Sequence, residues 1–149
     1  MKLKSIFIVI IFLNPCISYS QSIDSNNELD TQIAEFVFQM ASNPNFQLNE
    51  IPMYGGVAIT ELQKISNDNL IIEIEIMDVT REEALEQAIM RGWEFFNSGD
   101  ILTSIKRFNQ AWLMNPGHPE VYYGFGDYLG MIEEFEGAIL IFKSLSAFL

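Results

Sequence analysis

Apolar and small residues between Leu85 and Leu149 follow an order that nearly repeats itself after about 34 residues. In the first unit, the small, glycine, aromatic and proline positions are Ala88, Gly92, Phe95, Ser104, Phe108, Ala111 and Pro116. In the second unit, the matching positions are Tyr122, Phe125, Gly126, Leu129, Ala138, Phe142 and Leu145. The pattern predicts two similar structural units in the C-terminal half of the chain.

Two glycines in this repeat predict closely packed helix pairs. Gly92 and Gly126 fall in the middle of expected helices, where glycine costs about 1 kcal/mol relative to alanine. Close approach of a second helix accounts for that cost, with Ser104 or Ala138 facing the glycine across each hairpin. Larger side chains would then fill the seam in two pairs, Phe95 with Phe108 and Leu129 with Phe142.

Turn and cap residues mark the ends of these helices. Thr80 and Glu83 form a capping-box pattern at the start of the first unit. Gly99 and Asp100 supply a turn glycine and an N-cap between the first two helices. The stretch 115–119 ends the second helix, because a residue that precedes proline avoids the helical region.

The segment before the repeat predicts one further helix and a loop. Residues 21–29 are polar and predict a disordered leader, after which Asp30 is a candidate N-cap. Apolar residues then recur on one helical face, at Ile33, Phe36, Val37 and Met40, before Asn43-Pro44 ends the helix. Within the loop over 44–56, Gly55-Gly56 predicts a tight turn that places Tyr54 against the helical body.

Residues 69–79 carry a mixed signal. Ile72, Ile74 and Ile76 alternate with glutamates, which favours a strand. No second strand signal accompanies them, and an isolated strand leaves its backbone groups without partners. We therefore expect a helix from about Thr60 to Met77, so that residues 30–80 comprise N-terminal helices and the Gly-Gly loop.

The first 20 residues have the order of a secretory signal peptide. Lys2 and Lys4 precede an apolar run from Ile6 to Leu13, which is followed by small residues up to Ser20. The run is shorter than the ~20 residues that span a bilayer. We expect cleavage after Ser20 and export, with a periplasmic location and no membrane span in the mature chain. A lipid anchor on Cys16 and full secretion are the alternatives.

The acidic charge limits the partners. The chain has a formal net charge of −12, and cleavage after Ser20 would leave six basic against 20 acidic residues, or −14. Such a surface repels nucleic acid and anionic lipid, which excludes both as partners and favours basic or neutral ones. The mature chain would contain no cysteine, so no disulfide would stabilise it.

No residue set in the chain predicts catalysis. One histidine, His118, cannot make up a zinc site of three or four nitrogen or sulfur ligands. The spacing of acids lacks the calcium-loop pattern, and no G-x-S-x-G nucleophile motif is present. We expect no catalytic residues, metal or cofactor, and the protein is not expected to be an enzyme.

The repeat positions resemble the tetratricopeptide pattern W-x2-L-G-x2-Y…A-x3-F…P, in the manner of small exported bacterial members. The resemblance implies an all-α fold in which residues 81–149 form the antiparallel helix pairs of a short superhelix, with extra N-terminal helices. It covers about the C-terminal half. The sequence departs from the pattern at Ala88, Arg91, Ser104 and Glu133.

The resemblance also implies a groove lined by the first helix of each pair. Its residues here would be Glu86, Ile89, Trp93, Phe96, Asn97, Glu120, Tyr123, Asp127 and Met131. The lysines and arginines with which the family clamps a C-terminal carboxylate are missing. An acidic and aromatic groove favours a cationic or proline-bearing peptide or protein segment.

Two functions follow from these observations, with a hydrolase as a distant third. The first is an exported interaction module that binds a peptide or protein. The second is a structural subunit that self-associates, because the last helix carries apolar residues around most of its circumference. We expect this face to be hidden by the N-terminal helix folding back, by a second copy of the chain or by a different protein. We favour self-association or a partner, with a dimer through Ile141, Leu145 and Phe148, since the N-terminal helix is separated from that end by the whole array.

Overall fold

The computed structural model describes residues 25–56 and 79–145, and these residues form helices and turns without a strand. The α-helices are α1 (Ser25–Ala41), α3 (Arg81–Asn97), α4 (Ile101–Met114), α5 (Pro119–Met131) and α6 (Phe135–Ser144), with two 3-10 helices, η1 (Leu48–Glu50) and η2 (Pro52–Gly56). The all-α expectation is confirmed for this part of the chain. The helix expected over 60–77 lies outside the described residues.

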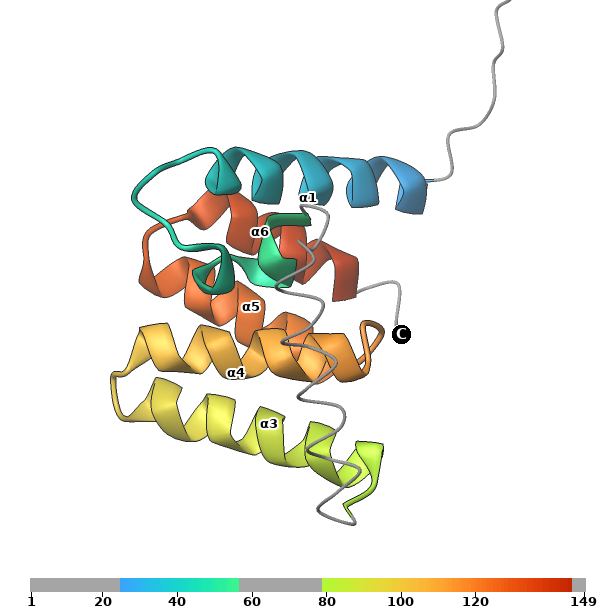
Figure 1. The fold of residues 1–149 in the computed structure, drawn as a ribbon. Coiled ribbons are helices and arrows are strands. Elements are labelled where there is room, and N and C mark those ends of the chain that lie inside the picture. The colour runs from blue at the N-terminus through green and yellow to red at the C-terminus, as the bar shows by residue number, and fades with distance from the viewer. Residues whose placement is uncertain (1–24, 57–78, 146–149) are drawn as a thin grey trace, which may run out of the picture.

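The helices follow one another in the order α3, α4, α5, α6 and α1, with neighbours running in opposite directions (Figure 1), and α3 also contacts α5. The N-terminal helix therefore lies beside the C-terminal one. Their contact is close, since a side chain at Gly137 of α6 would collide with the ring of Phe36 on α1. The loop between Ser42 and Gly56 folds back from α1 onto α4.

This closure corrects the expectation of an open C-terminal face. Ile141 is fully buried and Leu145 is 7% exposed within the single chain, and Phe148 lies outside the described residues. The physical reason is that α1 presents its own apolar face, including Ile33 and Val37, to the common core. The end of the array is therefore covered by the chain's own first helix.

Helix α1 begins at Ser25, earlier than the expected cap at Asp30. The added turn places the Glu28 carboxylate near the positive end of the helix dipole. It also packs Leu29 against the core. These contacts order part of the stretch that was predicted to be a disordered leader.

The predicted caps of the first hairpin are confirmed. The Thr80 hydroxyl accepts a hydrogen bond from the backbone amide of Glu83. The Glu83 carboxylate in turn accepts a hydrogen bond of 2.9 Å from the backbone amide of Thr80. The Asp100 carboxylate accepts a bond of 3.1 Å from the Thr103 amide at the start of α4. Both caps satisfy backbone donors that a helix start leaves free.

The two hairpin turns share one backbone geometry at positions 34 residues apart. Asp100 N–H donates to Phe95 O at 3.0 Å, and Glu134 N–H donates to Leu129 O at 2.9 Å. This bond characterises the Schellman turn, whose left-handed residue is Gly99 in one hairpin and Glu133, at φ 66°, in the other. The second turn therefore forms despite its missing glycine.

Three glycines of α3 and α5 each make room for an aromatic ring. A Cβ at Gly92 of α3 or at Gly124 of α5 would lie 2.6 Å from atoms of the Phe108 ring. Phe108 is fully buried, so its ring is wedged between the first helices of both pairs. Phe108 therefore occupies the space left at Gly92, and Phe142 lies over Gly126 in the same way.

Candidate functional site

The exposed residues of the predicted groove occupy one side of α3 and one side of α5. On α5, Glu120, Tyr123, Asp127 and Met131 are all exposed and follow one helical face. On α3, Glu86 and Asn97 are exposed at corresponding positions. Six of the nine predicted groove residues therefore have side chains open to solvent, and we call these six the first-helix face.

The three remaining groove residues are held by packing. Ile89 is 5% exposed because it lies on the same buried side of α3 as Leu85 and Gly92, so its side chain is not open to solvent as the predicted groove would require. Trp93 and Phe96 are half-buried. The Trp93 ring meets the rings of Phe108 and Phe96 edge-on, with centroids 5.0 and 5.7 Å away.

The first-helix face is acidic. Glu86 Oε1 lies 3.8 Å from Nε2 of His118, the residue before α5, which brings the starts of α3 and α5 together. Partial burial raises the pKa of the Asp127 carboxyl. Several cations of the described helices are engaged elsewhere: Lys106 pairs with Glu50, Arg81 donates to Leu113 O, and Arg107 donates to Gln110.

An exposed apolar strip continues the first-helix face onto α6. The rings of Tyr123 and Phe142 lie 6.5 Å apart, so α5 and α6 share one aromatic contact at the surface. Phe135 is 61% exposed and Ile139 is 54% exposed at helical spacing along α6. Apolar side chains that gather in this way mark surfaces at which proteins associate.

A second feature, not predicted from the sequence, is a loop fastened into the core. The buried Asn109 amide of α4 donates to Asn49 O at 3.1 Å and to Ile51 O at 2.9 Å. The buried Tyr128 hydroxyl of α5 donates to Glu50 O at 2.7 Å. The signal available in the sequence was a polar residue, Asn109, directly after a core aromatic.

The fastened loop ends in a left-handed turn. Met53 (φ 53°, ψ 29°), Tyr54 (φ 52°, ψ 35°) and Gly55 (φ 68°, ψ 14°) all lie in a region that side chains rarely adopt. Gly55 is also required by space, since a Cβ there would lie 2.8 Å from Ala41 Cβ. The expected tight turn is confirmed, and burial raises the pKa of the half-buried Tyr54.

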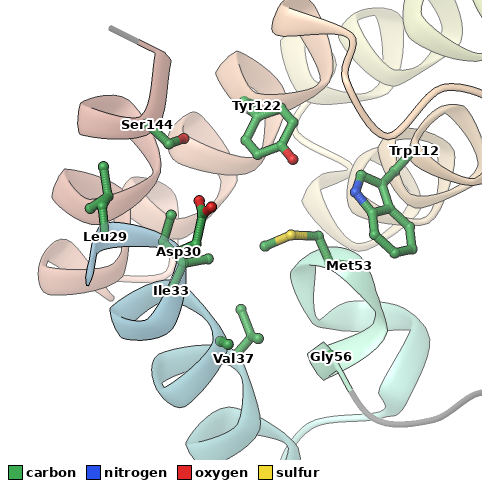
Figure 2. A pocket seen from close by; sticks show the side chains of 10 residues that line it. Leu29, Asp30, Ile33, Val37, Met53, Gly56, Trp112, Tyr122 and Ser144 are labelled. Atoms are coloured by element: carbon green, nitrogen blue, oxygen red, sulfur yellow. The ribbon is translucent and has the colours of Figure 1, made fainter. Parts of the chain in front are cut away.

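A cavity of about 430 Å³ lies where this turn meets α1 (Figure 2). It is lined mainly by apolar groups, and we call it the α1 cavity. Its lining residues are Leu29, Asp30, Ile33, Ala34, Val37, Met53, Gly56, Trp112, Tyr122 and Ser144.

We expect the Tyr128 phenol to make the protein sensitive to alkali. Burial, followed by the charges of Glu50 and Glu134, raises its pKa to about 12. The folded state thus favours the neutral phenol, so this contribution is complete below the ordinary tyrosine pKa of about 10 and is lost as pH rises from about 10 to about 12. The loss should be about 2 kcal/mol, allowing for solvent screening.

Urea unfolding across that pH range measures this loss against Tyr128→Phe. The variant should be less stable at neutral pH, because Glu50 O loses its donor, but it should lose less stability than the wild type as pH rises. Parallel stability curves for the two proteins would contradict the assignment.

Within the described ranges, no group of three or more histidine, cysteine, aspartate or glutamate residues is arranged to hold a metal ion. None of the helices described has the length and apolar character needed to cross a membrane. Compared with known families, with curated proteins and with solved structures, the chain shows no significant match. The resemblance to tetratricopeptide repeats therefore stays a prediction.

Proposed function

We propose that the protein is an exported interaction module, built from tetratricopeptide-like helix pairs, that binds a peptide or protein segment across the first-helix face. The observation that carries this proposal is the Phe108 ring between Gly92 and Gly124. The ring belongs to α4, so α3 and α5 both pack against this helix. The exposed residues of α3 and α5 remain open to solvent. The shared turn geometry at Gly99 and Glu133 supports the same repeat.

The chemistry of the face selects the partner. Glu86, Glu120 and Asp127 provide three carboxylates, while Tyr123 and Met131 provide exposed apolar surface. Carboxylates beside an aromatic ring attract lysine and arginine side chains, and the apolar strip accommodates aliphatic or proline residues. The partner is accordingly a basic or neutral segment with apolar residues.

Self-association through Ile141 and Leu145 of the last helix is not favoured. Ile141 and Leu145 are already buried by contacts within one chain, so exposing them to a second copy would cost core packing. A binding role fits the open first-helix face better than a structural subunit does.

Charge reversal tests the binding face. Peptides selected from a random displayed library against the purified chain should be basic or neutral. Changing Glu86, Glu120 and Asp127 together to lysine should weaken their affinity at least about tenfold, measured by fluorescence anisotropy, because three attractive contacts become repulsive. The helical circular-dichroism signal should be unchanged, since all three residues are exposed.

The matched control reverses three exposed acids of α1 and α6 instead: Glu28, Glu35 and Glu136. This control variant changes the net charge by the same amount. Because salt screens distant charges, the affinity of the control variant for the peptide should stay within about threefold of that of the wild type. Equal losses in both triple variants, or no loss in either, would place the binding surface elsewhere.

Export is tested separately. The native protein is expected to begin at Gln21, because the order of charged, apolar and small residues places cleavage after Ser20. N-terminal sequencing and intact mass of the natively expressed protein measure this. An intact Met1, or lipid attached to Cys16, would contradict cleavage at this position.

A further inference from the structure

The α1 cavity has the size and lining of a small-molecule site. Its volume of about 430 Å³ falls within the range usual for ligand pockets. Ile33 and Val37 of α1 form an apolar wall, opposite Met53 of the fastened loop (Figure 2). The polar side chains of the lining are Asp30, Tyr122 and Ser144. In ligand pockets a small number of polar groups fixes the orientation of the ligand.

The protein holds Met53 in the cavity wall at a conformational cost. Its left-handed backbone costs of order 1 kcal/mol or more for a residue with a side chain. The turn that contains it follows directly on the segment fastened by Asn109 and Tyr128. The Met53 side chain points into the cavity (Figure 2), and a thioether adapts its shape to apolar ligands.

The polar side of the cavity is suited to a positive charge. Asp30 is exposed to solvent, and its carboxylate lines the cavity beside Tyr122 (Figure 2). Its charge contributes to raising the pKa of the Tyr122 phenol, after burial. Within the described ranges, no lysine, arginine or histidine forms an ion pair with Asp30. The rings of Tyr122 and Trp112 complete this side, and aromatic rings attract cations.

We propose that the α1 cavity binds a small amphiphilic amine, whose apolar body lies among Ile33, Val37 and Met53 and whose ammonium group pairs with Asp30 beside the Tyr122 ring. The volume suits a molecule of ten to fifteen heavy atoms or so rather than a folded partner. The site is independent of the first-helix face, because its lining residues come from α1, η2, α4, the first turn of α5 and the end of α6.

Three probes of the same shape and different charge test the site by isothermal titration calorimetry. They are 4-phenylbutylamine, the neutral 4-phenylbutan-1-ol and the anionic 4-phenylbutyrate. The amine should bind about threefold more tightly than the alcohol, because an ion pair with the exposed Asp30 carboxylate is added, and the carboxylate should bind most weakly. No binding of any probe at millimolar concentration, or equal binding of all three, overturns the proposal.

Variants identify the residues involved. Asp30→Asn should abolish the preference for the amine over the alcohol, whereas Glu35→Gln, an exposed acid of the same helix outside the cavity lining, should leave it within about twofold. Ala34→Phe should fill the cavity and weaken all three probes, with the melting temperature verifying the fold. A preference for the amine that survives Asp30→Asn contradicts the assignment of the charge.

Discussion

Replacing Phe108 with alanine is expected to lower the free energy of unfolding by about 3–5 kcal/mol. The ring is fully buried and occupies the space left by the absent side chains of Gly92 and Gly124, with Trp93 against its edge. Its removal leaves a cavity between two helix pairs that neither pair can close alone. Urea denaturation followed by circular dichroism measures the loss.

Two alanine substitutions in α5 provide the matched test of this wedge. Gly124→Ala should destabilise the protein by about 1–3 kcal/mol, because the new Cβ would lie 2.6 Å from the Phe108 ring. Gly130→Ala should instead stabilise it by about 0.5–1 kcal/mol, since nothing lies within 4 Å and alanine favours helix. Two variants that are stabilised alike would show that the ring is not wedged there.

Replacing Asn109 with leucine is expected to cost about 2–4 kcal/mol. Leucine keeps nearly the same volume but removes the donors to Asn49 O and Ile51 O, and the second of these carbonyls is buried. The same change should release the loop that carries Met53. Urea denaturation measures the stability, and faster hydrogen exchange at the Tyr54 amide, which donates to Ile51 O at 3.1 Å, reports the release.

Gln110→Leu is the control for this substitution. Gln110 is the next residue of α4, is only half-buried and bonds the Arg107 side chain rather than the loop, so its loss should stay below about 1 kcal/mol. An Asn109→Leu protein that is as stable as the Gln110→Leu protein would contradict the role of Asn109 as the anchor of the loop.

Local signals in the sequence were sufficient for the hairpins of the C-terminal half. The Thr80 capping box, the Asp100 cap and the turn at Gly99 depend on residues within a few positions of one another, and all three form as predicted. The helical all-α class follows from the same short-range patterns for the part of the chain described. Predictions of this kind succeed because the interaction partners are close in sequence.

Contacts between distant segments were not predictable in this way. The packing of α1 on α6 joins residues about 100 positions apart, and neither helix carries a local signal that identifies its neighbour. The same holds for Asn109, whose partners lie 58 and 60 positions away, in a loop with no regular pattern. The α1 cavity depends on the packing of α1 on α6 and on the loop that Asn109 holds, so the sequence did not predict it. For the same reason, self-association was expected at a face that α1 covers.

The structure separates two surfaces with different chemistry. The first-helix face is open and includes three exposed carboxylates, and we propose that it binds an extended segment of a partner protein. The α1 cavity is apolar and suits a small molecule. Because the two surfaces draw on different residues, substitutions in one should leave binding at the other unchanged.

We propose that partners bind across the first helices of the two pairs, and amide chemical-shift mapping tests this binding mode most directly. Titrating the isotope-labelled chain with a library-selected peptide should shift the amides of Glu86, Asn97, Tyr123, Asp127 and Met131 while leaving those of Glu28 and Glu35 on α1 in place. Shifts confined to α1 and the loop over 48–56, with none on α3 or α5, would contradict the account.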